Sequence, residues 1–136
     1  MKLSKLLDEC ENYGDTEIKN IVLDTARVEK GSLFFCLKGV KNDGHDYAAQ
    51  ACEKGAAAVV AQRRVEADVP QIICEDTRHA LSVAAKRYYG SAADRLKIFA
   101  VTGTNGKTTT TYMLKAIFES NGFNTGLIGT NAVEYG

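Results

Sequence analysis

The residues from Ile98 to Thr111, Ile-Phe-Ala-Val-Thr-Gly-Thr-Asn-Gly-Lys-Thr-Thr-Thr-Thr, combine glycine, lysine and hydroxyl groups at a spacing that suits phosphate. The apolar residues at the start predict a strand, and the residues after the lysine predict a helix. A strand that turns through Gly103 and Gly106 into a helix aims several backbone N–H groups at one point, where the helix dipole adds positive charge. This pattern predicts a phosphate-binding loop.

Each residue of the loop has an expected role with ATP and Mg²⁺ as cofactors. Lys107 is expected to reach the β- and γ-phosphates and to be the catalytic residue, and the Thr108 hydroxyl is expected to bind Mg²⁺. The predicted ATP contacts are Gly103, Thr104, Asn105, Gly106, Lys107, Thr108 and Thr109.

The glycine spacing departs from the common phosphate loop, whose first glycine would stand at position 101. This chain has Val101 there, and Gly103 lies closer to Gly106. The alternative is a chance Gly-Lys-Thr that opens a helix. The strand before, the helix after and the two glycines favour nucleotide binding.

Short apolar runs alternate with helical patterns along the rest of the chain. Strands are predicted over residues 21–24, 33–37, 57–61 and 71–74, and helices over residues 3–10, 46–54 and 76–90. Strands that alternate with helices indicate an α/β fold with a mostly parallel sheet.

Residues 90–95 are small, polar and aperiodic, as expected of a domain boundary. We therefore predict a small N-terminal α/β domain over residues 1–95. Residues 96–136 are predicted to form the first β-α-β of a P-loop-type central domain, with strands at 97–101 and 125–128 and a helix over 107–121. That domain would be incomplete, so we expect unpaired strand edges and an exposed apolar face.

Composition favours a soluble globular protein, with 45% hydrophobic and 25% charged residues and zero formal net charge. This balance indicates neither a nucleic acid nor a membrane as partner. No signal peptide is recognisable, and no apolar run approaches the roughly 20 residues that span a bilayer. The cysteines are far apart, which predicts reduced thiols in the cytoplasm. They are Cys10, Cys36, Cys52 and Cys74.

Two histidines and a carboxylate pair have structural interpretations. His45 is expected to order the turn from Asp43 to Tyr47, and His79 is expected on a helix surface. Asp76 is expected to begin a helix, since neighbours such as Glu75 and Asp76 point apart on a strand.

The stretch Thr102–Thr109 resembles the ATP loop of the Mur ligases, the amide-bond-forming enzymes of peptidoglycan precursor synthesis. Segments of the N-terminal half follow the uridine-nucleotide-binding domain of that family in order. They are Leu23–Val28, Gly31–Phe35, Gly39, Asp43–Tyr47, Ala51 and Gly55–Ala56. The resemblance covers nearly all of residues 20–136.

The resemblance implies a second set of site residues, which would contact a UDP-linked substrate. They are Leu23 and Thr25 at the uridine end, and Val40, Lys41 and Asn42 at the diphosphate-sugar part. The family usually has Asp-Ser-Arg after the first strand, whereas this chain has Ala26 in place of the arginine and Arg27 one position later.

The implied activity is that of an ATP-dependent ligase that acts through an acyl phosphate. Its partners would be a UDP-N-acetylmuramoyl dipeptide and a free amino acid, and it would act as a monomer. Residues 101–114 and 126–130 are most similar to the family member that adds the third residue of the stem peptide. The alternatives are the sibling that adds D-Ala-D-Ala and a UDP-sugar-binding module without catalysis. We expect these 136 residues to show no turnover alone, because further catalytic parts of the family would follow them.

Overall fold

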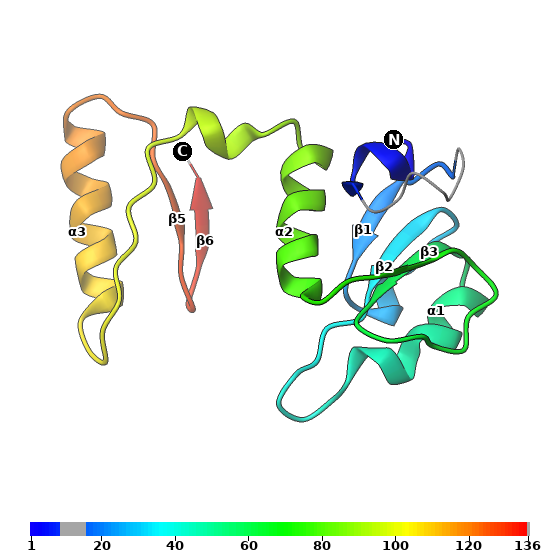
Figure 1. Ribbon diagram of the computed structural model, residues 1–136. Helices are drawn as coiled ribbons and strands as arrows, with labels where there is room; N and C mark the ends of the chain where they lie inside the picture. Colours follow the sequence, from blue (N-terminus) through cyan, green and yellow to red (C-terminus); the bar gives the residue numbers. More distant parts are fainter. Residues whose placement is uncertain (9–15, 136) are drawn as a thin grey trace. The chain divides into compact units, whose positions relative to one another are not determined.

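The computed structural model describes residues 1–8 and 16–135 of the chain (Figure 1). The chain divides into two compact units, Met1–Leu96 and Lys97–Gly136. In the described residues, the helices are too short or too polar to cross a membrane.

The first unit is built on a four-stranded sheet whose strands all run parallel, in the order β1-β2-β3-β4. The strands are β1 (Asn20–Val22), β2 (Ser32–Phe35), β3 (Ala56–Ala61) and β4 (Gln71–Ile73). In the centre of the sheet, Val60 lies between Phe35 on one side and Ile72 on the other. The predicted α/β class and parallel sheet are confirmed.

Both faces of this sheet are buried, as parallel sheets require. The covering helices are α1 (Ala48–Glu53) and α2 (Thr77–Tyr88). Leu33 and Phe35 pack into one apolar cluster, with Ala80 and Ala84 of α2. The alternate residues Phe34 and Cys36 belong to a second cluster, on the α1 side. The period of two along β2 thus divides the core into two layers.

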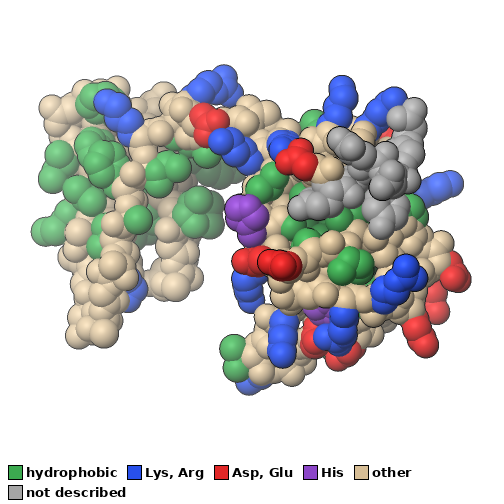
Figure 2. All heavy atoms as spheres, in the orientation of Figure 1, with side chains coloured by type: hydrophobic (Ala, Val, Ile, Leu, Met, Phe, Trp, Pro, Cys, Tyr) green, Lys and Arg blue, Asp and Glu red, His purple; other side chains and the backbone are tan. Residues whose placement is uncertain are grey.

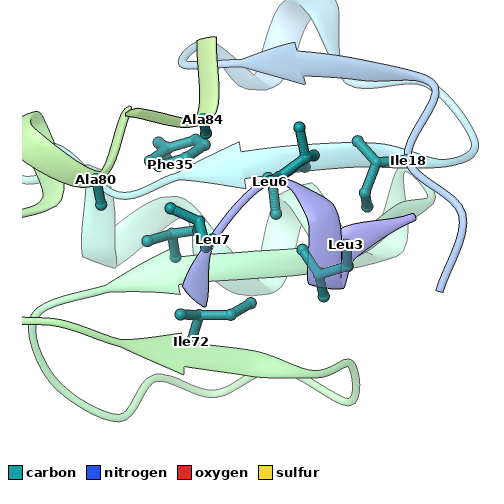
Figure 3. Close-up of a cluster of buried hydrophobic side chains, with 11 residues drawn as sticks. Leu3, Leu6, Leu7, Ile18, Phe35, Ile72, Ala80 and Ala84 are labelled. Atoms are coloured by element: carbon teal, nitrogen blue, oxygen red, sulfur yellow. The ribbon is translucent and has the colours of Figure 1, made fainter. Parts of the chain in front are cut away.

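The N-terminal segment is not the helix predicted over residues 3–10. Within residues 1–8 the structure has a 3-10 turn at Leu3–Lys5 and no α-helix, and Cys10 lies outside the described residues. Leu3, Leu6 and Leu7 are nevertheless buried, and Figure 3 shows their side chains gathered with the core residues of the sheet and α2. The helix-like spacing of these leucines in the sequence therefore reflects their burial against one face of the sheet, and not a helix.

Asp76 begins α2, as predicted. Its carboxylate accepts hydrogen bonds from the backbone N–H groups of Arg78 at 2.8 Å and His79 at 3.1 Å. These bonds, from His79 first and Arg78 second, lower the pKa of Asp76 from its ordinary value. The helix predicted over 46–54 is a 3-10 turn at Gly44–Tyr47 that continues into α1.

The second unit contains a helix and an antiparallel hairpin. Its elements are α3 (Lys107–Ser120), β5 (Gly126–Ile128) and β6 (Val133–Tyr135). The predicted helix is confirmed, but the strand predicted over 97–101 is absent, so residues 97–135 contain no β-α-β. A parallel partner requires a long crossover, whereas β5 pairs with β6 across a tight turn closed by the Gly129 N–H to Ala132 carbonyl bond of 2.9 Å.

Aromatic contacts and a polar network connect the elements of this unit. The Phe118 ring lies 5.0 Å from that of Phe99 and 6.3 Å from that of Phe123. Glu134 on β6 accepts hydrogen bonds from the Tyr112 hydroxyl at 2.7 Å and the Lys115 ammonium at 3.0 Å, both on α3.

Residues 97–135 bury little apolar surface. Leu127 alone is buried there, and Ile128 and Tyr135 are each 86% exposed. Figure 2 shows hydrophobic side chains gathered on the surface of this unit, whereas charged side chains are frequent on the first. The predicted exposed apolar face is therefore present.

We predict that amides in β2 and β3 exchange hydrogen at least about tenfold more slowly than amides in α3 and β5, because local opening is easiest where few apolar contacts must break. Hydrogen exchange read by NMR on one sample checks this, with the two units as internal controls. Equal protection of both units would contradict it.

Candidate functional site

The residues predicted to contact a UDP-linked substrate lie at one edge of the parallel sheet. Leu23 and Thr25 follow the carboxyl end of β1, and the loop of residues 38–43 follows the carboxyl end of β2. Adjacent parallel strands end at the same edge, where ligands of open α/β sheets bind. The fold therefore brings these two segments to one side of the sheet.

The segment after β1 is a short turn set by Asp24. The Asp24 carboxylate accepts a 2.9 Å hydrogen bond from the Ala26 N–H, which ends the strand earlier than predicted and begins a 3-10 turn at Thr25–Arg27. The Lys54 ammonium, at the end of α1, donates to the Thr25 carbonyl at 2.9 Å. Leu23 remains 51% exposed, so an apolar contact is available at this edge.

The loop of residues 38–43 is narrow at its base and open at its tip. Lys38 and Asp43 form an isolated antiparallel bridge, and the Gly39 N–H donates to the Asn42 carbonyl at 2.9 Å. At the tip Val40 is fully exposed, and Lys41 and Asn42 are exposed beside it. The tip thus presents an ammonium, an amide and backbone groups to solvent.

Gly44 permits the narrow base of the loop. A Cβ at this position would lie 2.6 Å from the Leu37 nitrogen and 2.9 Å from the Leu37 carbonyl oxygen. The backbone there is close enough for the Gly44 N–H to donate to that carbonyl at 2.9 Å. Any larger residue would force the two chains of the loop apart.

A polar cluster holds the carboxylate of Asp43 at the base of the loop. One of its oxygens accepts from the His45 backbone N–H at 3.0 Å and from the His45 ring, and the other accepts from Arg63 at 3.2 Å. The backbone N–H of His45, then its ring, then Arg63 lower the pKa of Asp43 to about 2. The prediction that His45 orders this turn is confirmed by these contacts.

The cluster includes residues that the sequence did not identify. Gln62 and Arg63 follow the carboxyl end of β3, and Arg78 on α2 donates to the Lys38 carbonyl at 3.1 Å. Gln62 and Arg63 could have been found in the sequence by their position alone. Polar residues directly after a third parallel strand lie at the same edge of the sheet as the residues after its neighbours.

The predicted phosphate loop lies in the second unit, before α3. Gly103 and Gly106 have φ values of +145° and +76°, which favour glycine. The first helical hydrogen bond runs from the Thr110 N–H to the Gly106 carbonyl at 2.9 Å, so the N–H groups of residues 107–109 have no partner within the helix. These donors can receive an anion.

Lys107 folds back over this loop, and its ammonium donates to the Gly103 carbonyl at 2.6 Å. The other predicted ATP contacts are exposed; they are Thr104, Asn105, Thr108 and Thr109. A cation above the loop, with free donors at the helix start, can neutralise a polyphosphate.

Residues 17–89 match the family described as "Mur ligase family, catalytic domain", and residues 101–136 match "Mur ligase middle domain". The chain belongs to the Mur ligase family. The resemblance found in the sequence is therefore confirmed, and it spans both units.

Named Mur ligases resemble this chain in sequence and structure. The UDP-N-acetylmuramoyl-L-alanyl-D-glutamate–2,6-diaminopimelate ligase of Bacillus licheniformis is 50% identical, over 96% of this chain and 28% of its own length. A solved structure of a ligase of that name superposes with a TM-score of 0.70 at 29% identity, covering 87% of this chain and 25% of its own. The MurF ligase of Thermotoga maritima in complex with ADP gives a TM-score of 0.54 at 31% identity, covering 77% and 24%.

We predict that Asp43→Asn lowers stability by an amount that depends on pH. Because the folded pKa of about 2 lies below the usual 3.8, the Asp43 carboxylate stabilises the fold above the unfolded value. That contribution is lost as pH falls from about 4 towards 2. Urea unfolding of both proteins across this range measures the difference, which should shrink on acidification.

Glu66→Gln, on the exposed turn before β4, is the control and should show no such trend. A difference between wild type and Asp43→Asn that stays constant down to pH of about 2 would contradict the assigned role of the carboxylate.

Proposed function

We propose that the first unit, within residues 1–95, binds the UDP end of UDP-N-acetylmuramoyl-L-alanyl-D-glutamate at the carboxyl edge of its sheet. Leu23 and Thr25 would contact the uridine, and Val40, Lys41 and Asn42 the diphosphate-sugar part. The observation that carries this proposal is the loop of residues 38–43, whose base is held by backbone and side-chain bonds while its apolar tip residue Val40 is fully exposed. A fully exposed valine on a fixed loop suits a ligand-covered surface.

We propose that residues 96–136 begin the ATP-binding domain. The predicted contacts are Gly103, Thr104, Asn105, Gly106, Lys107, Thr108 and Thr109. The glycine conformations and the N–H groups without a helical partner at the start of α3 support this, as does the ADP-bound relative.

The donor set also fits Mg²⁺. The Thr108 hydroxyl is exposed and supplies a hard oxygen of the kind that Mg²⁺ accepts. The described residues contain no group of three or more His, Cys, Asp or Glu that could hold a metal. Mg²⁺ is commonly held by substrate phosphates and water with only one or two protein oxygens, and when bound it would neutralise charge on the transferring phosphoryl group.

The chain spans about 28% of the length of the Bacillus licheniformis relative, so the complete reaction is proposed for a longer protein. In it, a carboxylate oxygen of the D-glutamate residue would attack the γ-phosphorus of ATP, forming an acyl phosphate and releasing ADP. The amine of the incoming amino acid would then attack the acyl carbon, releasing inorganic phosphate and a proton. Lys107 would stabilise the negative charge that shifts onto the leaving ADP.

The third amino acid is proposed to be 2,6-diaminopimelate. The solved structures do not separate the candidates, because a diaminopimelate ligase and a MurF ligase are 29% and 31% identical to this chain. The 50% identity to a diaminopimelate ligase favours that member. We further propose a monomer that works in the cytoplasm, the compartment that the wide spacing of the cysteines in the sequence favours.

We predict that the chain binds UDP-N-acetylmuramoyl-L-alanyl-D-glutamate and that Lys41→Met weakens this binding about tenfold or more, since a hydrogen bond to a charged group contributes roughly 1.5–3 kcal/mol. Isothermal titration calorimetry checks this. Lys30→Met removes an exposed ammonium that precedes the amino end of β2 and should leave affinity unchanged. Absence of binding by the wild-type chain, or equal losses in both variants, would refute the assignment.

We predict that Lys107→Met weakens MgATP binding about tenfold or more, because the substitution removes the loop's cation but keeps most of the side-chain length. A fluorescent ATP analogue displaced by MgATP gives the affinities, and Lys97→Met is the matched control in the same unit. If wild type and Lys107→Met bind MgATP equally, the ATP assignment fails. Binding of the UDP substrate without any binding of ATP would favour the simple UDP-sugar-binding module.

A further inference from the structure

His45 is a buried polar residue with both ring nitrogens in hydrogen bonds. Its exposed fraction is 5%, and an imidazole buried without partners would be costly. Nδ1 lies 2.5 Å from an Asp43 carboxylate oxygen, and Nε2 accepts from the Gln62 backbone N–H at 2.9 Å. The ring therefore links the base of the loop of residues 38–43 to the first residue after β3.

The direction of these bonds fixes the tautomer of the ring. The Gln62 backbone N–H can only donate, so Nε2 carries the lone pair. The proton of the neutral ring is then on Nδ1, where it is donated to Asp43. One side chain thus acts as donor and acceptor at the same time, towards two different segments.

Asp43 is the residue through which this link reaches the loop tip. The backbone of Asp43 forms the isolated antiparallel bridge with Lys38 at the base of the loop. The exposed tip residues Val40, Lys41 and Asn42 lie between these two residues in the sequence. On its far oxygen the same carboxylate is held by Arg63, whose own side chain is 58% exposed. The base is therefore clamped from a buried side and a solvent side.

We propose that His45 is a positioning residue for the UDP-linked substrate. Its ring bridge between Asp43 and Gln62 holds the loop so that Lys41 and Asn42 meet the diphosphate-sugar part. The inference rests on the proposed function and extends it to a residue that does not touch the substrate. Preorganisation of the loop lowers the conformational cost of binding.

Two substitutions separate the halves of the bridge. In His45→Asn, the amide can still donate to Asp43 but is too short to accept from Gln62. In His45→Gln, the longer amide can accept from Gln62 but matches the Asp43 bond poorly. Both lose ring packing, so both are expected to lower the melting temperature.

The readout is the dissociation constant for UDP-N-acetylmuramoyl-L-alanyl-D-glutamate, measured by calorimetry on the 136-residue chain well below the melting temperature. We expect both His45→Asn and His45→Gln to bind about tenfold more weakly than wild type, because each variant breaks one half of the bridge. His79→Asn, on the exposed surface of α2, is the control and should bind as wild type. Wild-type affinity in either His45 variant would overturn the proposal, because a histidine that only stabilises the fold would change the melting temperature and not the affinity.

A second pair of variants avoids any loss of the buried ring. Arg63→Met and Arg64→Met both remove one positive charge from exposed positions, but only Arg63 holds Asp43. We expect about threefold weaker binding for Arg63→Met than for Arg64→Met. Equal affinities would overturn the clamp. A wild-type chain that does not bind the substrate would instead refute the proposed function, so the two failures are distinguishable.

Discussion

The common direction of the four strands in the first unit is the constraint on which its candidate site depends. Since β1, β2 and β3 run parallel and are hydrogen-bonded side by side, every segment that leaves a carboxyl end emerges at one edge. Both sheet faces are covered, so side chains within the strands serve the core. The polar side chains that could contact a ligand therefore lie in the segments after the strands. Thr25, Lys41 and Arg63 are examples.

The two candidate loops reach a defined shape by different physical means. The loop of residues 38–43 is fixed by tertiary contacts, because His45 is buried against β3 and Gly44 lets two backbone segments touch. The phosphate loop is fixed locally. Gly103 and Gly106 adopt positive φ, and a Cβ on Gly106 would meet nothing within 4 Å, so conformation alone requires glycine there.

The sequence predicted the features that depend on local pattern. The apolar run of β2, the cap at Asp76 and the glycines of the phosphate loop all act through their immediate neighbours, and each was found. The errors fall where tertiary context decides. The residues around Leu6 are placed by packing against the sheet, and residues 97–101 form no strand although their apolar run favours one. The same distinction applies to the site residues. Val40 and Lys41 were proposed through family resemblance. Arg63 belongs to the polar cluster because β3 pairs with β2, and the pattern within a single segment does not predict which strands pair.

The second unit has a helix and a hairpin that follow local sequence preferences, but residues 97–135 bury little apolar surface to stabilise them. Its polar network lies at the surface, where the hydroxyl of Tyr112 and then the ammonium of Lys115 lower the pKa of Glu134, and such exposed contacts contribute little stability. An anion bound to the N–H groups at the start of α3 would add charge-assisted hydrogen bonds to a helix end that has few other contacts. At equal ratios of free ligand to dissociation constant, the two sites would contribute the same stabilisation, which would be a larger share of the stability of this sparsely packed unit than of the well-packed first unit.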